Sequence, residues 1–224
     1  MNNRYPHTFR LFSLLLPCVV FHGLRAQTLT AADVLLPEGP SYRMQLIPEV
    51  VPWDTLAGNN VTWAYDWLEV DTTDTETFRW LEPTTGQGAA NYPNANYAMR
   101  SIGGTNNDYI IDTYYTLGTN GLLNIGSVGP VLSYVYETPE MEFTFPAAVG
   151  DTSGGDYCFT SDGFGIQYHF CGASYVTYDA HGTLILPYGT FTDVKHVTHW
   201  RSSWESTTSV DSSYSITQQW FLPG

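Results

Sequence analysis

Apolar and polar residues alternate along most of this chain with a period of two, which is the period of a β-strand and not of a helix. Two segments, 62–70 and 141–145, show the alternation clearly. The residues on one face of these segments are Trp63, Tyr65 and Trp67, and Met141, Phe143 and Phe145. We expect Trp63 and Trp67 to pack in a core, and the acidic residues of the second segment to face solvent.

Clusters rich in Gly, Asn and Pro separate the alternating segments and predict turns. They lie at 57–60, 86–88, 103–107, 118–121 and 151–155. Regular turns between such strands predict an all-β fold, either an antiparallel β-sandwich or strongly curved antiparallel sheets. The stretch 84–97 lacks periodic apolar positions and is predicted to be a long surface loop.

Two further hairpins are predicted near the C-terminus. A turn at 179–182 is expected to precede a strand at 183–186, and a turn at 187–190 to precede a strand at 191–200. Pro187 presets φ for the second turn, so the chain reverses there with little strain.

The first 26 residues have the features of an export signal. Arg4 and Arg10 flank the start of a short apolar run at 11–21, and Ala26 is the small residue that a signal peptidase requires, which makes Gln27 the expected new N-terminus. The apolar run is shorter than the ~20 residues that span a bilayer. The alternatives to a cleaved signal are a membrane anchor and lipid attachment at Cys18.

The predicted mature chain, 27–224, forms one β-rich domain with a possible internal seam near 139–150. The full sequence has 8 Lys and Arg against 22 Asp and Glu, a formal net charge of −14. Three arginines leave with the signal, so 5 basic residues face 22 acidic ones and the net charge becomes −17. This balance argues against a nucleic-acid partner. No transmembrane segment is expected after signal removal.

Two cysteines remain after the predicted cleavage, Cys158 and Cys171. A turn at 161–165 is expected to fold a hairpin that places them opposite each other, so we predict a disulfide, which an oxidising compartment would favour. In the chain-entropy model a loop of this size contributes about 3 kcal/mol of stability. Two free thiols are the alternative. No metal site is predicted, because two cysteines alone do not complete a four-ligand shell.

The histidines give no metal site either. His196 and His199 are three residues apart, and an odd offset on a strand sends the two side chains to opposite faces. We expect them to be solvated or to lie on an edge strand. Asp151 and Asp156 are among the oxygen donors that calcium would prefer, but the sequence around them does not fit a calcium-binding loop.

Nothing in the sequence matches a known catalytic motif, and no catalytic residue or cofactor is predicted. One enzymatic alternative stays open, because a carboxylate pair of the glycosidase type can be assembled from separate strands. Its candidates are Glu137, Glu140, Glu142 and Glu205. The simpler interpretation is an acidic face exposed to solvent.

Aromatic residues give the best binding signal, since the chain has seven tryptophans and sixteen tyrosines. Aromatic rings stack on sugar faces while Asn, Asp and Thr bond to hydroxyl groups, so a glycan-binding face is physically reasonable. The candidate binding residues are Trp200, Trp204, Tyr114 and Tyr115. Tyr114 and Tyr115 are consecutive and are predicted to point to opposite faces, with at least one exposed.

Four segments resemble large secreted proteins of Bacteroidetes that use the type IX secretion route. They are the Gly-Thr-aliphatic cassette at 182–194, the Gly-Asn-x-x-Thr-Trp segment at 58–63, Phe-Pro leading to Gly-Asp at 145–151, and the closing stretch 214–224. The resemblance implies an extracellular or cell-surface β domain, usually followed by a C-terminal sorting domain, and we expect no such domain within residues 1–224. It carries no established catalytic residues.

These observations predict an exported, non-enzymatic β domain for adhesion or ligand binding at the cell surface or outside the cell. The partner would be a glycan or another surface protein. A secreted polysaccharide hydrolase and a purely structural spacer module are the alternatives. The expected location becomes the periplasm if no sorting domain follows.

Overall fold

The protein is described here from a computed structural model, which describes residues 27–35, 42–46, 54–69, 71–103, 109–163, 166–205 and 212–222. The predicted export signal, 1–26, lies outside the described residues. Among the described residues, no helix has the length and apolar character needed to cross a membrane.

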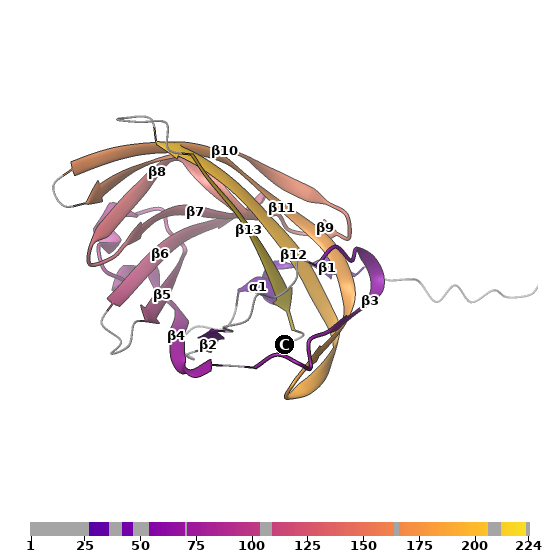
Figure 1. Cartoon of the computed structure of the whole chain (residues 1–224). Coiled ribbons are helices and arrows are strands. Elements are labelled where there is room, and N and C mark those ends of the chain that lie inside the picture. Colours follow the sequence, from indigo (N-terminus) through magenta and orange to yellow (C-terminus); the bar gives the residue numbers. More distant parts are fainter. Residues whose placement is uncertain are drawn as a thin grey trace, which may run out of the picture.

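One antiparallel sheet of eleven strands curls into a half-barrel and forms most of the molecule (Figure 1). Along the sheet the order is β13-β12-β11-β10-β8-β7-β6-β5-β4-β2, and β3 pairs with β11 off this path. The strands of this sheet are β2 (Tyr42–Leu46), β3 (Gly58–Ala64), β4 (Asp71–Leu81), β5 (Tyr97–Gly103), β6 (Tyr109–Gly118), β7 (Gly121–Val128), β8 (Leu132–Phe143), β10 (Thr152–Gly163), β11 (Ile166–Leu186), β12 (Gly189–Glu205) and β13 (Ser212–Phe221). The predicted all-β class is confirmed, in its form as a strongly curved antiparallel sheet.

Shorter elements lie inside the curve of the sheet (Figure 1). The strands β1 (Thr28–Leu29) and β9 (Ala147–Ala148) form a separate two-stranded sheet, and the helix α1 (Ala31–Val34) follows β1. Asp33 of α1 forms an ion pair with Lys195 of β12, and Thr30 closes a capping box with Asp33. These contacts hold the N-terminal segment against the concave face.

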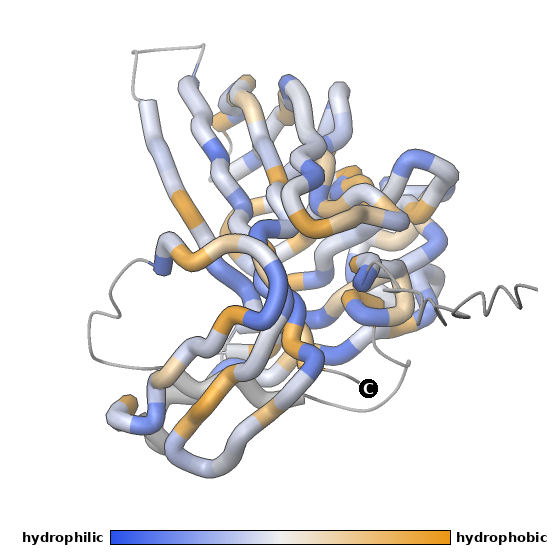
Figure 2. The backbone as a smooth tube through the Cα atoms, turned by 90° about the vertical axis from the view of Figure 1, so that its right-hand side faces the viewer, coloured by the Kyte–Doolittle hydropathy of each residue, from blue (hydrophilic) through white to orange (hydrophobic). Residues whose placement is uncertain are grey.

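The main core lies between the concave face and this N-terminal segment. Hydrophobic and hydrophilic residues alternate along the strands, as Figure 2 shows. The buried members of the main core are Leu29, Val34, Trp80, Tyr115, Leu122, Phe143, Ala147, Val176, Tyr178 and Val197. Because these residues come from both ends of the chain and from most of the strands, their burial fixes the curvature of the whole sheet.

A second core forms on the outer face around the buried Trp63 of β3. β3 runs parallel to the last part of β11, where Gly182 pairs with Val61. A Cβ atom on Gly182 would lie only 1.8 Å from the Val61 carbonyl oxygen, so this pairing requires glycine. The cassette at 182–194 therefore has a packing role.

The predicted turn at 179–182 is wrong, because β11 continues through it to Leu186. Asp179 is instead the extra residue of a bulge between the pairs Tyr178 with Val197 and Ala180 with His196. A bulge bends a strand without ending it. The second predicted turn is confirmed, since β11 ends at Leu186 and β12 begins at Gly189.

Trp63 is buried in the core as expected, but Trp67 is 50% exposed. The predicted strand at 62–70 ends at Ala64, because the chain turns at residues 66 and 67. The turn breaks the alternation that would have kept Trp67 on the face of Trp63.

Residues 84–97 do not form a simple surface loop. The 3-10 helices η1 (Pro83–Thr85) and η2 (Ala89–Asn91) fold over the outer face, and Tyr92 stacks on Tyr114 with 4.3 Å between ring centroids. Tyr114 is fully buried under this segment, and Tyr115 is 7% exposed in the main core. The prediction that one of these tyrosines is exposed is wrong, because both faces of β6 are covered at this point.

The predicted disulfide is confirmed. Cys158 of β10 and Cys171 of β11 are direct partners in the antiparallel ladder and are joined with an S–S distance of 2.06 Å. The bond lies on the outer face, since Tyr157 next to Cys158 points into the concave face.

Candidate functional site

A cluster of charged and polar side chains lies on the concave face, next to the main core. On β12, residues 197, 199 and 201 share one face, so His199 and Arg201 follow the buried Val197 along the strand. Glu140 and Glu142 reach the same place from β8. We call the group Glu140, Glu142, Ser174, His199 and Arg201 the concave charged cluster.

A bulge in β8 brings both glutamates to this cluster. Leu122 pairs with Phe143 and Leu123 with Met141, so Glu142 is the extra residue on β8. Strict alternation would have placed Glu140 and Glu142 on the face of the sheet away from Phe143, exposed to solvent. Glu140 is instead only 3% exposed, so the predicted acidic solvent face is wrong at this position.

Glu140 is the centre of the cluster. Its Oε1 lies 2.9 Å from Arg201 Nε, and its Oε2 accepts a hydrogen bond from the Tyr136 hydroxyl. Neither Glu140 Oε1 nor Arg201 Nε makes an aligned hydrogen bond within the described residues. The two charged groups are therefore close, but these two atoms do not share an aligned hydrogen bond.

His199 lies between the two glutamates. Its Nε2 is 3.8 Å from Glu140 Oε1, and its Nδ1 is 3.9 Å from Glu142 Oε2. Nε2 also shares a hydrogen bond of 2.7 Å with the hydroxyl of Ser174. Burial lowers the pKa of His199 even though Glu140 acts in the opposite direction.

Glu142 has the most altered carboxyl group of the cluster. Burial, and secondly the negative charge of Glu140, raise the pKa of Glu142 to about 7, although a 3.2 Å hydrogen bond from Asn124 Nδ2 acts in the opposite direction. Glu142 is thus partly protonated at neutral pH. The cluster holds one carboxyl group that can donate a proton beside one carboxylate that is paired with an arginine.

Aromatic rings surround the charged cluster on the concave face. We call this group the concave aromatic wall; it consists of Tyr134, Tyr136, Tyr157, Phe159 and Phe170. Phe159 lies at its centre, with ring centroids 5.1 Å from Tyr134 and 5.0 Å from Phe170. The Arg201 guanidinium carbon lies 4.8 Å from the centroid of the Tyr157 ring, a cation–π contact.

The wall is not a closed core. Tyr134, Phe159 and Phe170 are half-buried, while Tyr157 is fully buried beneath Arg201. The Arg201 side chain is 35% exposed. A molecule on the concave face can therefore contact both the rings and the guanidinium.

The arrangement limits the chemistry that is available. The contacts run from Ser174 to His199 and on to Glu142, as in a hydrolase triad. However, Ser174 is fully buried, and the 3.9 Å distance between His199 Nδ1 and Glu142 Oε2 is too long for a hydrogen bond. A buried serine is not accessible for attack on a substrate. The two glutamates are the groups that can act as an acid and a base.

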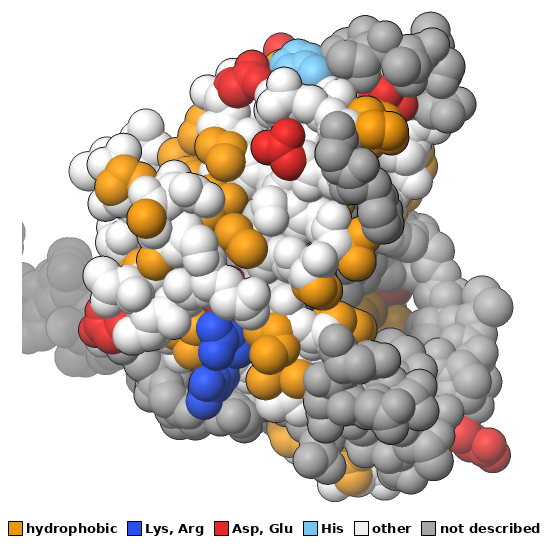
Figure 3. Space-filling view, turned by 90° about the vertical axis from the view of Figure 1, so that its left-hand side faces the viewer, with side chains coloured by type: hydrophobic (Ala, Val, Ile, Leu, Met, Phe, Trp, Pro, Cys, Tyr) orange, Lys and Arg blue, Asp and Glu red, His pale blue; other side chains and the backbone are white. Residues whose placement is uncertain are grey.

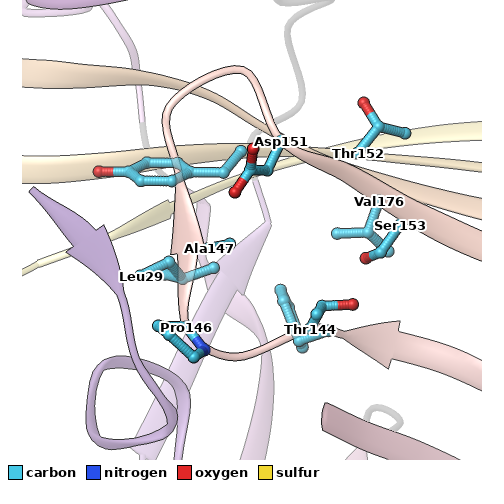
Figure 4. A pocket seen from close by; sticks show the side chains of 10 residues that line it. Leu29, Thr144, Pro146, Ala147, Asp151, Thr152, Ser153 and Val176 are labelled. Atoms are coloured by element: carbon cyan, nitrogen blue, oxygen red, sulfur yellow. The ribbon is translucent and has the colours of Figure 1, made fainter. Parts of the chain in front are cut away.

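A small pocket lies beside this cluster, where Val176 follows Ser174 on the same face of β11. In Figure 4, Leu29 and Ala147 lie on one side of it and Val176 and Ser153 on the other. Its volume is about 170 Å³, which is below the ~300 Å³ at the lower end of small-molecule sites. The pocket alone is thus too small for an oligosaccharide.

Trp200 and Trp204 lie on the outer face and, unlike Tyr114, are not covered. Trp200 is half-buried between Tyr175 and Tyr214, with ring centroids 5.5 and 5.3 Å away. Trp204 is 44% exposed and pairs with Cys171 across the strands. We call the group Tyr175, Trp200, Trp204 and Tyr214 the outer aromatic strip. Its rings are tilted relative to one another by 47° and 73°, so they do not form one flat platform.

The predicted opposite orientation of His196 and His199 is confirmed, but the prediction that they are solvated is wrong. His196 is 1% exposed and lies between Trp63 and Trp220, with ring centroids 5.5 and 4.7 Å away. Of the four carboxylate candidates, Glu140 and Glu142 meet in the cluster. Glu137 lies on the outer face, beside His169.

Sequence reasoning missed Arg201, Ser174 and the wall around them. One signal was present, because Arg201 is one of only five basic residues of the predicted mature chain and shares a strand face with His199. Figure 3 shows how sparse charge is on one side of the molecule, where most atoms are uncharged. In a chain with so few basic residues, an arginine predicted to share a strand face with His199 is therefore a signal for a functional site.

Comparison with protein-family models, with curated proteins and with solved structures found no match.

Proposed function

We propose that this protein is a ligand-binding domain that holds a hydroxyl-rich ligand, best matched by a carbohydrate, on the concave face of its half-barrel. The observation that carries the proposal is the pair of Glu140 and Arg201: the carboxylate is buried, the guanidinium is 35% exposed beside half-buried rings, and Arg201 Nε and Glu140 Oε1 share no aligned hydrogen bond. Burying a carboxylate is costly unless its pairing geometry is excellent, so this pair is poorly explained by stability alone.

The chemistry around the pair suits a sugar. Phe159 and Tyr134 offer rings for stacking on the apolar faces of a pyranose. The partly exposed Arg201 offers N–H donors, and the half-buried Tyr134 offers a hydroxyl that can donate or accept, so neighbouring hydroxyl groups of one sugar find both kinds of partner. The net charge of −17 predicted for the mature chain favours a neutral ligand over a polyanion.

This proposal keeps the expected activity, ligand binding, and moves it from the outer aromatic strip to the concave face. Export, surface location and the resemblance to type IX secreted proteins remain predictions. The disulfide between Cys158 and Cys171 gives weak support to an oxidising compartment.

Glycan-array screening of the purified protein, followed by calorimetric titration of the best ligand, tests the proposal. Phe159→Leu removes a ring of the concave aromatic wall and Arg201→Met removes the guanidinium. Each is expected to lower the affinity about tenfold or more. Trp204→Leu is the matched control on the outer face and should leave the affinity unchanged.

The opposite pattern, with loss of binding only in Trp204→Leu, would place the ligand on the outer aromatic strip and contradict the proposal. Circular dichroism of each variant checks that the fold is retained. A parent protein that binds no glycan also contradicts it.

A second candidate function is hydrolysis of a glycosidic bond. It is favoured by one observation, that Glu142 has a pKa raised to about 7 beside Glu140. In this scheme Glu142 protonates the leaving oxygen and Glu140 acts as base or nucleophile. A reducing-sugar assay on the bound glycan tests it. Activity in the parent and none in Glu142→Gln would support hydrolysis, whereas binding without release of reducing ends would leave the domain a binder only.

A further inference from the structure

Three metal-binding side chains meet on the outer face, on the side of the sheet away from the concave charged cluster, and a fourth lies beside one of them. Cys158 and Cys171 are cross-strand partners, and His169 precedes Cys171 by two residues on the same face of β11. The two sulfur atoms and a ring nitrogen of His169 all lie within 4.8 Å of one another. Three strong ligands for zinc are thus already gathered.

Glu137 of β8 provides the fourth side chain. It is the extra residue of a bulge, between the pairs of Tyr136 with Phe159 and Thr138 with Cys158, and it is exposed. Its Oε2 lies 3.3 Å from His169 Nε2, and its Oε1 accepts a 2.5 Å hydrogen bond from Thr160. The carboxylate is therefore held beside the imidazole.

We propose that the reduced form of this protein binds one zinc ion through Cys158, Cys171, His169 and Glu137, and that formation of the disulfide releases it. Two thiolates, one imidazole and one carboxylate complete a tetrahedral shell. With bonds of about 2.0 to 2.3 Å, the ligand atoms of such a shell lie roughly 3.5 to 4 Å apart. Reduction frees the two sulfur atoms to separate to this spacing, and the exposed Glu137 side chain must turn toward them to complete the shell.

The redox step balances without any group beyond a thiol reductant and a disulfide oxidant. A dithiol reductant gives two electrons and two protons to the Cys158–Cys171 disulfide and becomes a disulfide itself. Zinc then binds as the two thiols lose their protons. In the reverse direction, a low-molecular-weight disulfide takes two electrons from the two thiolates, the S–S bond forms again and the zinc ion leaves.

Cobalt and zinc titrations of the purified protein test this inference. The protein is reduced with a phosphine, which is removed before metal is added without oxygen. Reduced protein should bind one equivalent of Co²⁺ with thiolate-to-metal charge transfer and the intense visible bands of tetrahedral cobalt, and one equivalent of Zn²⁺ should displace it. The oxidised protein should show neither signal.

Variants separate a four-ligand site from two reactive thiols. His169→Gln and Glu137→Gln keep both cysteines and are each expected to weaken zinc binding at least about tenfold, since loss of even an outer-shell partner has such an effect. Asp162→Asn, a nearby exposed carboxylate on the same hairpin, is the matched control and should bind like the parent. Circular dichroism of the reduced, metal-free protein shows whether the sheet persists.

Equal zinc affinity in His169→Gln, Glu137→Gln and the parent would overturn the inference, because the cysteines would then act alone. Equal binding by oxidised and reduced protein would overturn it as well. Glycan binding on the concave face is independent of these results, so failure of one proposal does not decide the other.

Discussion

Among the described residues, two arginine–carboxylate pairs lie within this sheet, one on each face, and their surroundings differ. On the outer face, Arg100 Nε and Nη2 each donate a 2.7 Å hydrogen bond to the fully buried Asp112. The backbone N–H of Gln87 donates a third, of 2.5 Å, to Asp112. On the concave face, Arg201 Nε lies 2.9 Å from Glu140 Oε1 without an aligned hydrogen bond, and Arg201 Nη2 donates a 3.3 Å hydrogen bond to the Tyr136 hydroxyl.

The outer pair has a visible structural role. Tyr114 donates a 2.5 Å hydrogen bond to the Gln87 carbonyl oxygen, so Asp112 and Tyr114 together hold the segment 83–92 on the sheet. The bidentate geometry is the arrangement in which a buried ion pair stabilises a fold. Glu140 makes no hydrogen bond to backbone among the described residues. The proposed binding role of the concave face rests on this difference in hydrogen bonding between the two pairs.

The largest expected effect is that of Asp112→Asn. The amide would present N–H donors to Arg100 and to the Gln87 N–H, and the guanidinium would lose its counter-charge, so the free energy of unfolding should fall by about 3 to 5 kcal/mol. Urea denaturation measures this change. A loss below about 1 kcal/mol would show that the outer pair is not what holds the segment 83–92.

A pH dependence of stability is the next largest effect, and it arises from Glu142. Its pKa is raised in the folded state to about 7 from a reference value of 4.5. Between these values the folded protein binds more protons than the unfolded chain, so stability falls as the pH rises from about 4.5 to 7. The loss has an upper limit of about 3 to 4 kcal/mol, since one pKa unit corresponds to ~1.4 kcal/mol.

Glu142→Gln isolates this contribution. His199 acts with the opposite sign, because its lowered pKa makes stability rise with pH up to its unfolded value of 6.5. Since His199 is present in both proteins, the difference in unfolding free energy between the parent and Glu142→Gln should follow Glu142. Parallel pH profiles of the two proteins would contradict the assigned pKa shift.

The smallest expected effect on stability is that of Glu140→Gln, the amide replacement that matches Asp112→Asn. Arg201 is 35% exposed, so water can solvate its guanidinium when the carboxylate is lost, and the free energy of unfolding should change by about 1 kcal/mol or less. Ligand affinity should fall instead. A destabilisation as large as that of Asp112→Asn would make the concave pair structural and remove the main support for a binding site there.

Much of the local structure was predictable because its causes are local. The alternation of period two predicted strands, and the turn residues around 118–121 and 187–190 predicted the reversals that occur there. The disulfide followed from the symmetry of Cys158 and Cys171 about one hairpin. The opposite orientation of His196 and His199 required only their odd spacing.

The site was not predictable from the same rules. Bulges at Glu137 and Glu142 each add one residue to a strand and thereby change which side chains share a face. No pattern in the sequence marks these positions, because a bulge forms where a strand must follow both of its neighbours. The burial of Tyr114 also depends on a segment that looked like a surface loop.

The sequence by itself determined that this chain forms strands, where several of them turn and which two cysteines are joined, since period, turn propensity and hairpin symmetry act over a few residues. Only the tertiary structure decided that the strands form one curved sheet, that β3 joins it in parallel, and that two glutamates turn toward His199 and Arg201. These outcomes depend on contacts between residues far apart in the chain, and such contacts are set by the packing of the concave core as a whole.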